Sequence, residues 1–358
     1  LVPSYGYPAC DQCFTLGLHA DPRLLEIPVG RLSATSDAQV MAYLNKVETF
    51  ESQAPAPWMK RVGHLSGGND AAQQGQLADI LTALETRIGE NSSFGADVWS
   101  FRKSSSSILE TAAADSVRQL IEGGVTFMNF FAHAYSESFD ITIDDPSNYD
   151  WNGKYPMVMG NSCYIGNVHL NGDLASTTED WVLRDGEGPV AFLAGTLQGL
   201  VITLAQYCDL FYTSWGTANY GGTIGDHMRY AAFNYLGSQD NILVKYQTHT
   251  MTLQGDPALV LNSPKLPDYA INAQDIFYDP PTVTADVDTF SVKVVVRNIG
   301  RVVPDTVSFR LERSNAGLAS TQVVTTRLAG ISYQDTAVFR VPTLAFEGGQ
   351  GVNQLNVR

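Results

Sequence analysis

Residues 125–131, Val-Thr-Phe-Met-Asn-Phe-Phe, form a short apolar run that follows Gly124. Two similar runs come later in the chain, Pro-Met-Val-Met-Gly at residues 156–160 and Pro-Val-Ala-Phe-Leu-Ala at residues 189–194. Runs of this length, bounded by Gly, Pro and Asn, are typical of strands that are buried on both faces of a parallel sheet. The three segments therefore predict strands of one parallel sheet.

Helical periodicity appears in two stretches before these runs. In residues 71–88, apolar side chains fall on one stripe of a helix, and residues 108–122 show the same pattern. Alternation of amphipathic helices with buried strands predicts an α/β domain with helices on both faces of a mainly parallel sheet. We place this domain at residues 1–262.

The pattern changes after residue 262. A Pro-rich and polar composition indicates a linker, which we place at residues 263–275. The apolar runs that follow are residues 290–296, 307–311 and 336–341. Two of them alternate apolar and polar residues, as half-buried antiparallel strands do. Residues 276–358 are therefore expected to form a small β-sandwich.

Length, charge and hydropathy limit the classes of function. A chain of 358 residues is too long for one ordinary domain, which agrees with two domains. A net charge of −15 argues against binding a nucleic-acid backbone. No apolar stretch is long enough to span a membrane. The low content of charged residues suits an extracellular protein, and a start at Leu1 without Met leads us to expect a truncated or processed chain.

Four cysteines are present, and two of them, Cys10 and Cys13, are close in sequence. This pair indicates a local disulfide or two free thiols in a loop. A zinc site needs two further ligands, and neither Cys163 nor Cys208 has a neighbouring Cys or paired His to supply them. No metal is therefore expected, and Cys163 stays unpaired.

His133 and Cys163 follow two of the predicted strands. In open parallel sheets, catalytic groups lie beyond the carboxyl ends of the strands. A thiol nucleophile needs a histidine close enough to take its proton or to protonate the leaving amine. The alternative is structural: His133 is then an ordinary loop histidine and Cys163 a small buried apolar residue.

Four segments favour the catalytic interpretation. They are Ile-Pro-Val-Gly-Arg-Leu-Ser at 27–33, Phe-Phe-Ala-His-Ala at 130–134, Gly-Asn-Ser-Cys-Tyr-Ile-Gly-Asn at 160–167 and Gly-Asp-Pro-Ala-Leu at 255–259. Their order and spacing resemble those of gingipain-type cysteine peptidases, and most closely the PorU-like sortases of the type IX secretion system of Bacteroidetes. The resemblance implies a caspase-like α/β/α fold, and the trailing sandwich resembles the immunoglobulin-like domain of that family.

The same resemblance implies roles for particular residues. Cys163 would be the nucleophile and His133 the general acid and base, with backbone N–H groups of Cys163 and Ala134 as oxyanion donors. No cofactor would be required, and the structural calcium of some relatives has no recognisable ligand spacing here. The substrates would be exported proteins or peptides, including C-terminal signals, processed by hydrolysis or sortase-like transfer in a secreted or cell-surface location.

The chain departs from the family pattern at the site. The usual Gly-His-Gly motif carries Ala132 and Ala134, whose methyl groups narrow the approach and disfavour a positive φ. Ser66 stands where arginine-specific relatives have an acid that assists the histidine, and Leu77 stands near a second acid at the base of the specificity pocket. Leu200 falls near a pocket-lining aromatic position. Arginine specificity is therefore not expected.

Several other polar residues have two interpretations. Asp11 matches an Asp near the active-site rim of the family, and turn chemistry explains it equally well. His64 and His169 are auxiliary hydrogen bonders or ordinary loop histidines. The acids at 140, 144, 145 and 150 indicate a solvated loop, whereas Glu179 and Asp180 cap a helix.

Two functions other than catalysis stay open at this point. The departures at Ala132, Ala134 and Ser66 suit a peptidase-like scaffold that has been retained for binding within a secretion assembly. An adhesin that uses only the β-sandwich is the second alternative, and it leaves the pairing of His133 with Cys163 as coincidence.

Overall fold

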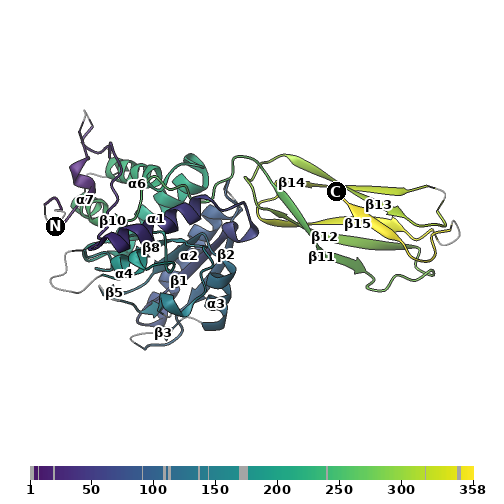
Figure 1. Cartoon of the computed structure of the whole chain (residues 1–358), viewed down its shortest axis with the longest axis horizontal. Helices are drawn as coiled ribbons and strands as arrows, with labels where there is room; N and C mark the ends of the chain where they lie inside the picture. The colour runs from purple at the N-terminus through teal and green to yellow at the C-terminus, as the bar shows by residue number, and fades with distance from the viewer. Residues whose placement is uncertain are drawn as a thin grey trace. The chain divides into compact units, whose positions relative to one another are not determined.

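The computed structural model of the chain describes all residues except 1–3, 7, 19–20, 91, 108–109, 112–113, 136–137, 144, 169–175, 239–240, 319 and 345–347. The chain divides into two compact units, Leu1–Pro264 and Lys265–Arg358 (Figure 1).

The first unit contains a six-stranded sheet in the order β10-β9-β8-β4-β1-β2. The strands are β1 (Arg61–Ser66), β2 (Asp97–Arg102), β4 (Phe127–Phe131), β8 (Met157–Asn161), β9 (Ala191–Gly195) and β10 (Met251–Gln254). All neighbours are parallel except β9 and β10, which are antiparallel. The three apolar runs of the sequence are β4, β8 and β9, and each is buried along its whole length, which confirms the prediction.

Helices cover both faces of this sheet. They are α1 (Asp37–Glu51), α2 (Ala71–Ile88), α3 (Ala114–Gly123), α4 (Thr177–Leu183), α5 (Val201–Thr213), α6 (Ile224–Ser238) and α7 (Ile242–Thr250). Side chains of β4 alternate between the faces: the Asn129 amide bonds Tyr212 on α5, whereas the Phe130 ring meets Trp181 on α4. The predicted α/β/α arrangement is confirmed.

Shorter elements complete the unit. They are β3 (Glu110–Thr111), β5 (Ala134–Tyr135), β6 (Ser138–Phe139), β7 (Ile141–Thr142), the 3₁₀ turns Gln12–Phe14, Pro57–Lys60 and Pro146–Asn148, and the π-helical turn Ser214–Ala218. The helix predicted at 108–122 was too long, because residues 110–111 pair with β7 instead. Pairing with a distant strand has overridden the local helical pattern there. In contrast, α2 has the predicted bounds.

The second unit consists of two antiparallel sheets, β11-β12-β15 and β14-β13-β16. Their strands are β11 (Tyr269–Asp279), β12 (Thr289–Asn298), β13 (Thr306–Ser314), β14 (Gln322–Ala329), β15 (Gln334–Pro342) and β16 (Gln354–Val357). Buried Val292, Phe309 and Phe339 belong to the shared core of the two sheets. The predicted linker at 263–275 was wrong in extent, because β11 already begins at Tyr269.

No helix in the described part of the chain is long and apolar enough to cross a membrane.

Candidate active site

The register of β4 and β8 brings His133 and Cys163 to the same edge of the sheet. The last paired residues of these neighbouring parallel strands are Phe131 and Asn161. His133 and Cys163 each lie two residues beyond that pair, and both side chains are partly exposed. Equal offsets past a shared register pair place both residues beyond the carboxyl edge of the sheet, where such sheets carry their sites.

The backbone around Cys163 is held in an unusual conformation. The Cys163 thiol contacts the Gly199 carbonyl at 3.7 Å. Tyr164, the next residue, has φ of 58°, which is costly for a residue other than glycine. Its N–H donates to the Leu197 carbonyl at 2.9 Å, which stabilises this turn. The N–H of Cys163 itself donates to none of the described residues, so it is available as an oxyanion donor.

Cys163 differs from the other cysteines in exposure. Cys208 is fully buried, and burial raises the pKa of its thiol to about 12, which makes it chemically inert. Cys10 and Cys13 form a disulfide. Within the described residues, Cys163 is therefore the free thiol that reaches solvent.

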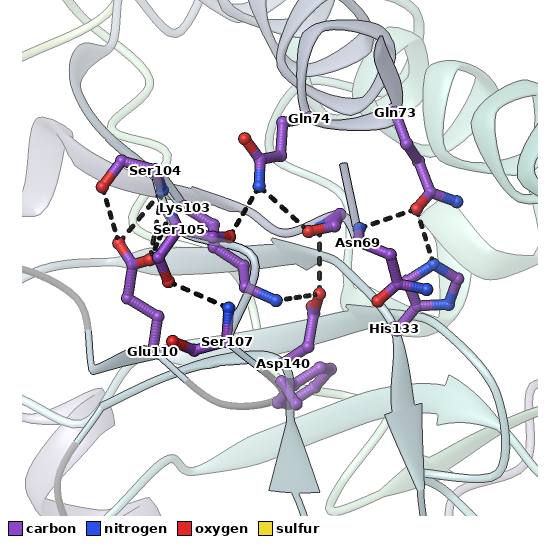
Figure 2. Close-up of polar contacts among 12 residues, drawn as sticks. Asn69, Gln73, Gln74, Lys103, Ser104, Ser105, Ser107, Glu110, His133 and Asp140 are labelled. Carbon is purple, nitrogen blue, oxygen red and sulfur yellow. Dashed lines mark hydrogen bonds and ion pairs between the residues drawn. The ribbon is translucent and has the colours of Figure 1, made fainter. Parts of the chain in front are cut away.

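His133 is held by a residue that sequence reasoning missed, Gln73. The Nε2 atom of His133 lies 2.9 Å from Oε1 of Gln73 on α2 (Figure 2). The same Oε1 accepts the Asn69 N–H at 2.8 Å, which identifies it as the carbonyl oxygen of the amide. Nε2 of His133 is therefore the donor, and its Nδ1 atom stays available for proton transfer.

Gln73 contacts the His133 ring, a role for which the sequence suggested Ser66. The Ser66 hydroxyl is buried and donates to the Phe101 carbonyl on β2 at 3.5 Å, whereas the described partner of the His133 ring is Gln73. A local signal for Gln73 does exist. Asp70 caps α2 by accepting the Gln73 N–H at 3.0 Å, and an Asp followed three residues later by Gln is a capping pattern.

A buried ion pair connects His133 to the turn before α2. Asp140 Oδ2 accepts the Gly68 N–H at 2.9 Å and lies 3.0 Å from the Lys103 ammonium (Figure 2). The Asp140 N–H donates to the His133 carbonyl at 2.8 Å. Position 67 requires glycine, because a Cβ atom there would overlap the Asp140 carboxylate.

The interpretation of Asp140 as part of a solvated loop was therefore wrong, because a buried cation, Lys103, faces it. The other acids of that group differ from it. Asp145 pairs with Arg184 at the surface, Asp150 is exposed, and Asp144 lies outside the described residues. Glu179 does complete a capping box with Ser176 on α4, as expected.

The alanines that flank His133 cause no backbone strain. Both methyl groups are buried, and neither Ala132, His133 nor Ala134 has a positive φ. The backbone strain expected from the loss of glycine therefore does not arise.

Two further candidates have partners other than His133 and Cys163. Asp11 is buried and forms an ion pair with Arg31 at 2.6 Å, which explains it structurally. His64 lies inside β1 and bonds the Tyr212 hydroxyl at 2.9 Å. Burial lowers the pKa of His64 to about 3, so it stays neutral. His169 lies outside the described residues.

A pocket of about 600 Å³ lies at the start of α5. Leu200, which follows the thiol contact Gly199, lines it, and so does Gln76, one helical turn beyond Gln73. Its other lining residues are Val201, Ile202, Thr203, Gln206, Tyr235, Asn241, Leu243 and Val244, none of them charged. Leu77, expected near the base of such a pocket, is buried in the core.

Three solved structures of peptidases have a fold similar to that of this chain. Gingipain R (RgpB), an Arg-specific cysteine proteinase, aligns with a TM-score of 0.58 at 15% identity over 95% of this chain and 74% of its own. The complex of Porphyromonas gingivalis RgpB pro- and mature domains gives 0.57 at 15% identity over 95% and 82%. A structure described only as a protease gives 0.57 at 14% identity over 93% and 78%. Identities this low establish the fold alone.

No curated protein sequence matches the chain. A sequence profile does match: that of Peptidase family C25, over residues 1–262, which includes every residue of the candidate site. The chain therefore belongs to peptidase family C25.

Proposed function

We propose that the chain is a cysteine peptidase in which Cys163 is the nucleophile and His133 the general acid and base. The observation that supports it best is the register of β4 and β8, which places both side chains two residues past one strand pair. Membership in family C25 supports peptidase chemistry, and the inert environment of Cys208 leaves Cys163 as the accessible free thiol among the described residues.

The chemistry uses groups of this chain alone. The Cys163 sulfur attacks the peptide carbonyl carbon while its proton passes to Nδ1 of His133. The carbonyl oxygen becomes an oxyanion, which the N–H groups of Cys163 and Ala134 bind. When the C–N bond breaks, the imidazolium gives its proton to the departing amine, and water then hydrolyses the thioester with His133 as base. No step needs a cofactor.

Covalent labelling tests this proposal directly. A peptide carrying a thiol-reactive acyloxymethyl ketone is expected to modify Cys163 in the folded protein, and peptide mapping locates the adduct. Denaturation before labelling must abolish selectivity, because Cys208 then becomes accessible. An unreactive Cys163 in folded protein would favour the alternative of a binding scaffold.

Gln73 provides a prediction about pH. Replacing Gln73 with Glu places a carboxylate beside the His133 ring, which favours the imidazolium form over the neutral ring. Because the attack step needs the neutral imidazole as base, the acidic limb of the kcat/KM profile is expected to shift to higher pH. Gln73→Ala should instead lower kcat/KM by about 10- to 100-fold, through a misplaced ring.

Gln39 is a matched control for Gln73. Its Oε1 accepts the Thr35 N–H at 2.7 Å, and its own N–H donates to the α1 cap Ser36, so it caps α1 without touching a histidine. Gln39→Ala should therefore lower the free energy of unfolding by about 1 kcal/mol through the lost helix cap, as Gln73→Ala does, and should leave the pH profile of kcat/KM unchanged. Equal pH profiles for wild type and Gln73→Glu would contradict the contact with His133.

The pocket next to Gly199 suggests the substrate class. Its lining, which is uncharged among the described residues, suits a substrate residue with an apolar side chain. Leu200→Asp is expected to lower kcat/KM for apolar substrates by about 10- to 200-fold, while raising the relative rate for Lys and Arg. Profiling with a positional peptide library measures both changes.

Ile242 is the control for this substitution, because it is 76% exposed and lies beside the pocket without lining it. Ile242→Asp introduces the same charge and should leave the specificity unchanged. A wild-type preference for Lys or Arg would contradict the proposed substrate class.

Hydrolysis and sortase-like transfer share the same acyl-enzyme, so the proposal includes both. Product analysis by mass spectrometry with and without an added amine separates them. We propose exported proteins at a bacterial surface as substrates. The Cys10–Cys13 disulfide supports this location, since disulfides persist in oxidising compartments.

A further inference from the structure

Three side chains of the kind that bind metals meet at a place separate from the dyad. Cys10 and Cys13 lie in the N-terminal loop, and His249 lies in the last turn of α7. Both sulfurs and a ring nitrogen of His249 are within 4.8 Å of one another. In the structure the two sulfurs form a disulfide. Sequence reasoning found no third ligand because His249 is so distant along the chain.

Other contacts fix this loop independently of the disulfide. The Asp11 carboxylate between the two cysteines is paired with Arg31, and both side chains are largely buried. The Thr196 hydroxyl donates to the Ala9 carbonyl at 3.3 Å, while the Thr196 N–H donates to the carbonyl of Thr250, next to His249. Reduction of the disulfide therefore leaves the loop and the end of α7 attached to each other.

Two cysteines and one histidine are a ligand set that zinc prefers, with a fourth position for water. Cys10 is buried, whereas Cys13 and His249 are partly exposed, so solvent reaches one side of the cluster. No carboxylate belongs to this cluster in the described residues, which disfavours calcium or magnesium. We propose that Cys10, Cys13 and His249 bind Zn²⁺ when the disulfide is reduced.

The reaction balances with a dithiol as the reductant. It supplies two electrons and two protons, the S–S bond breaks, and Cys10 and Cys13 become thiols while the reductant becomes a disulfide. Zn²⁺ then replaces the two thiol protons, which pass to solvent, and His249 binds through a neutral ring nitrogen. The disulfide and the metal are therefore alternative states of the same two sulfurs.

Cobalt binding to the full chain tests this proposal. The experiment uses Cys163→Ala protein, because the dyad is a second thiol–imidazole pair that could hold a metal. After reduction with a phosphine and its removal without air, Co²⁺ should bind at one equivalent with a thiolate-to-cobalt absorption band, and Zn²⁺ should displace it. Oxidised protein should give no band. The affinity for Zn²⁺ is then measured by competition with a chromophoric chelator.

His249→Gln in the same background is the decisive variant, because it keeps the disulfide and can be purified folded before reduction. It should weaken Zn²⁺ binding by about 100-fold or more. Unchanged affinity in His249→Gln would show binding by the thiols alone and overturn the three-ligand site. Absence of the cobalt band in reduced protein whose circular dichroism is native would overturn metal binding altogether. Because Cys163 is absent throughout, neither outcome depends on the proposed peptidase activity.

Discussion

Cys163→Ala is expected to lower kcat/KM for peptide cleavage by on the order of 10⁴- to 10⁶-fold, because it removes the proposed nucleophile, the accessible free thiol among the described residues. The fold should be retained, since the Cys163 side chain is partly exposed and its described contact is a weak one to the Gly199 carbonyl. Initial rates at several substrate concentrations, with enzyme quantified by absorbance and checked by circular dichroism, measure the effect.

The histidine and the thiol should act as one unit. His133→Ala alone is expected to cost nearly as much as Cys163→Ala, and the double variant should lose little more than either single one. Additive losses would mean that the two residues act in separate steps, which contradicts the dyad.

Cys208→Ala is the matched control for the thiol. Its sulfur contacts the Asn129 and Asn161 amides inside the core, so the change costs packing but should leave kcat/KM within about twofold. If Cys208→Ala abolished cleavage while Cys163→Ala retained it, the assignment of the nucleophile would be wrong.

The positions of His133 and Cys163 just past the ends of two strands could be predicted from the sequence, because the signals for these strands are local. A buried parallel strand is a continuous apolar run, and the residue type just beyond its end can be read directly, as at His133 and Cys163. The helix bounds of α2 were equally local, because its apolar stripe and its Asp70 cap lie within one segment.

The groups around the dyad depend on contacts that no local pattern shows. Gln73 and His133 are 60 residues apart in sequence, and Lys103 and Asp140 are 37 residues apart. An acidic residue in a loop is normally solvated, so only the position of Lys103 shows that Asp140 is buried. For the same reason β14, whose residues alternate between exposed and half-buried, gave no apolar run to recognise.

Asp140→Asn is expected to destabilise the peptidase unit by about 3–5 kcal/mol, because the variant leaves the Lys103 ammonium buried without a counter-charge. The Lys103 side chain is 0% exposed and that of Asp140 is 7% exposed, so water cannot replace the lost partner. The second change, Lys103→Met, removes the unpaired cation. The double variant Lys103→Met/Asp140→Asn should therefore lose less stability than the sum of the two single variants.

Urea unfolding followed by tryptophan fluorescence measures this effect in the full chain. All five tryptophans lie in the first unit, so the signal reports on the peptidase unit alone; they are Trp58, Trp99, Trp151, Trp181 and Trp215. Asp209→Asn is the control, because its ion pair with Arg87 is exposed and should contribute less than about 1 kcal/mol. Equal losses in Asp140→Asn and Asp209→Asn would contradict a buried, mutually dependent pair.

Asp140→Asn should also lower the rate of peptide cleavage. The Asp140 side chain accepts the Gly68 N–H, and the Asp140 backbone N–H donates to the His133 carbonyl. Asp140 therefore contacts both the turn that precedes Gln73 and the backbone of His133. Loosening these contacts should lower kcat by about 10-fold or more and change KM little, because the pocket that starts at Leu200 is untouched. Rates are normalised to active enzyme by titration with the covalent peptide label, at a temperature where the variant is folded. A kcat that stays at the wild-type value under these conditions would restrict Asp140 to a role in stability and separate it from the positioning of His133.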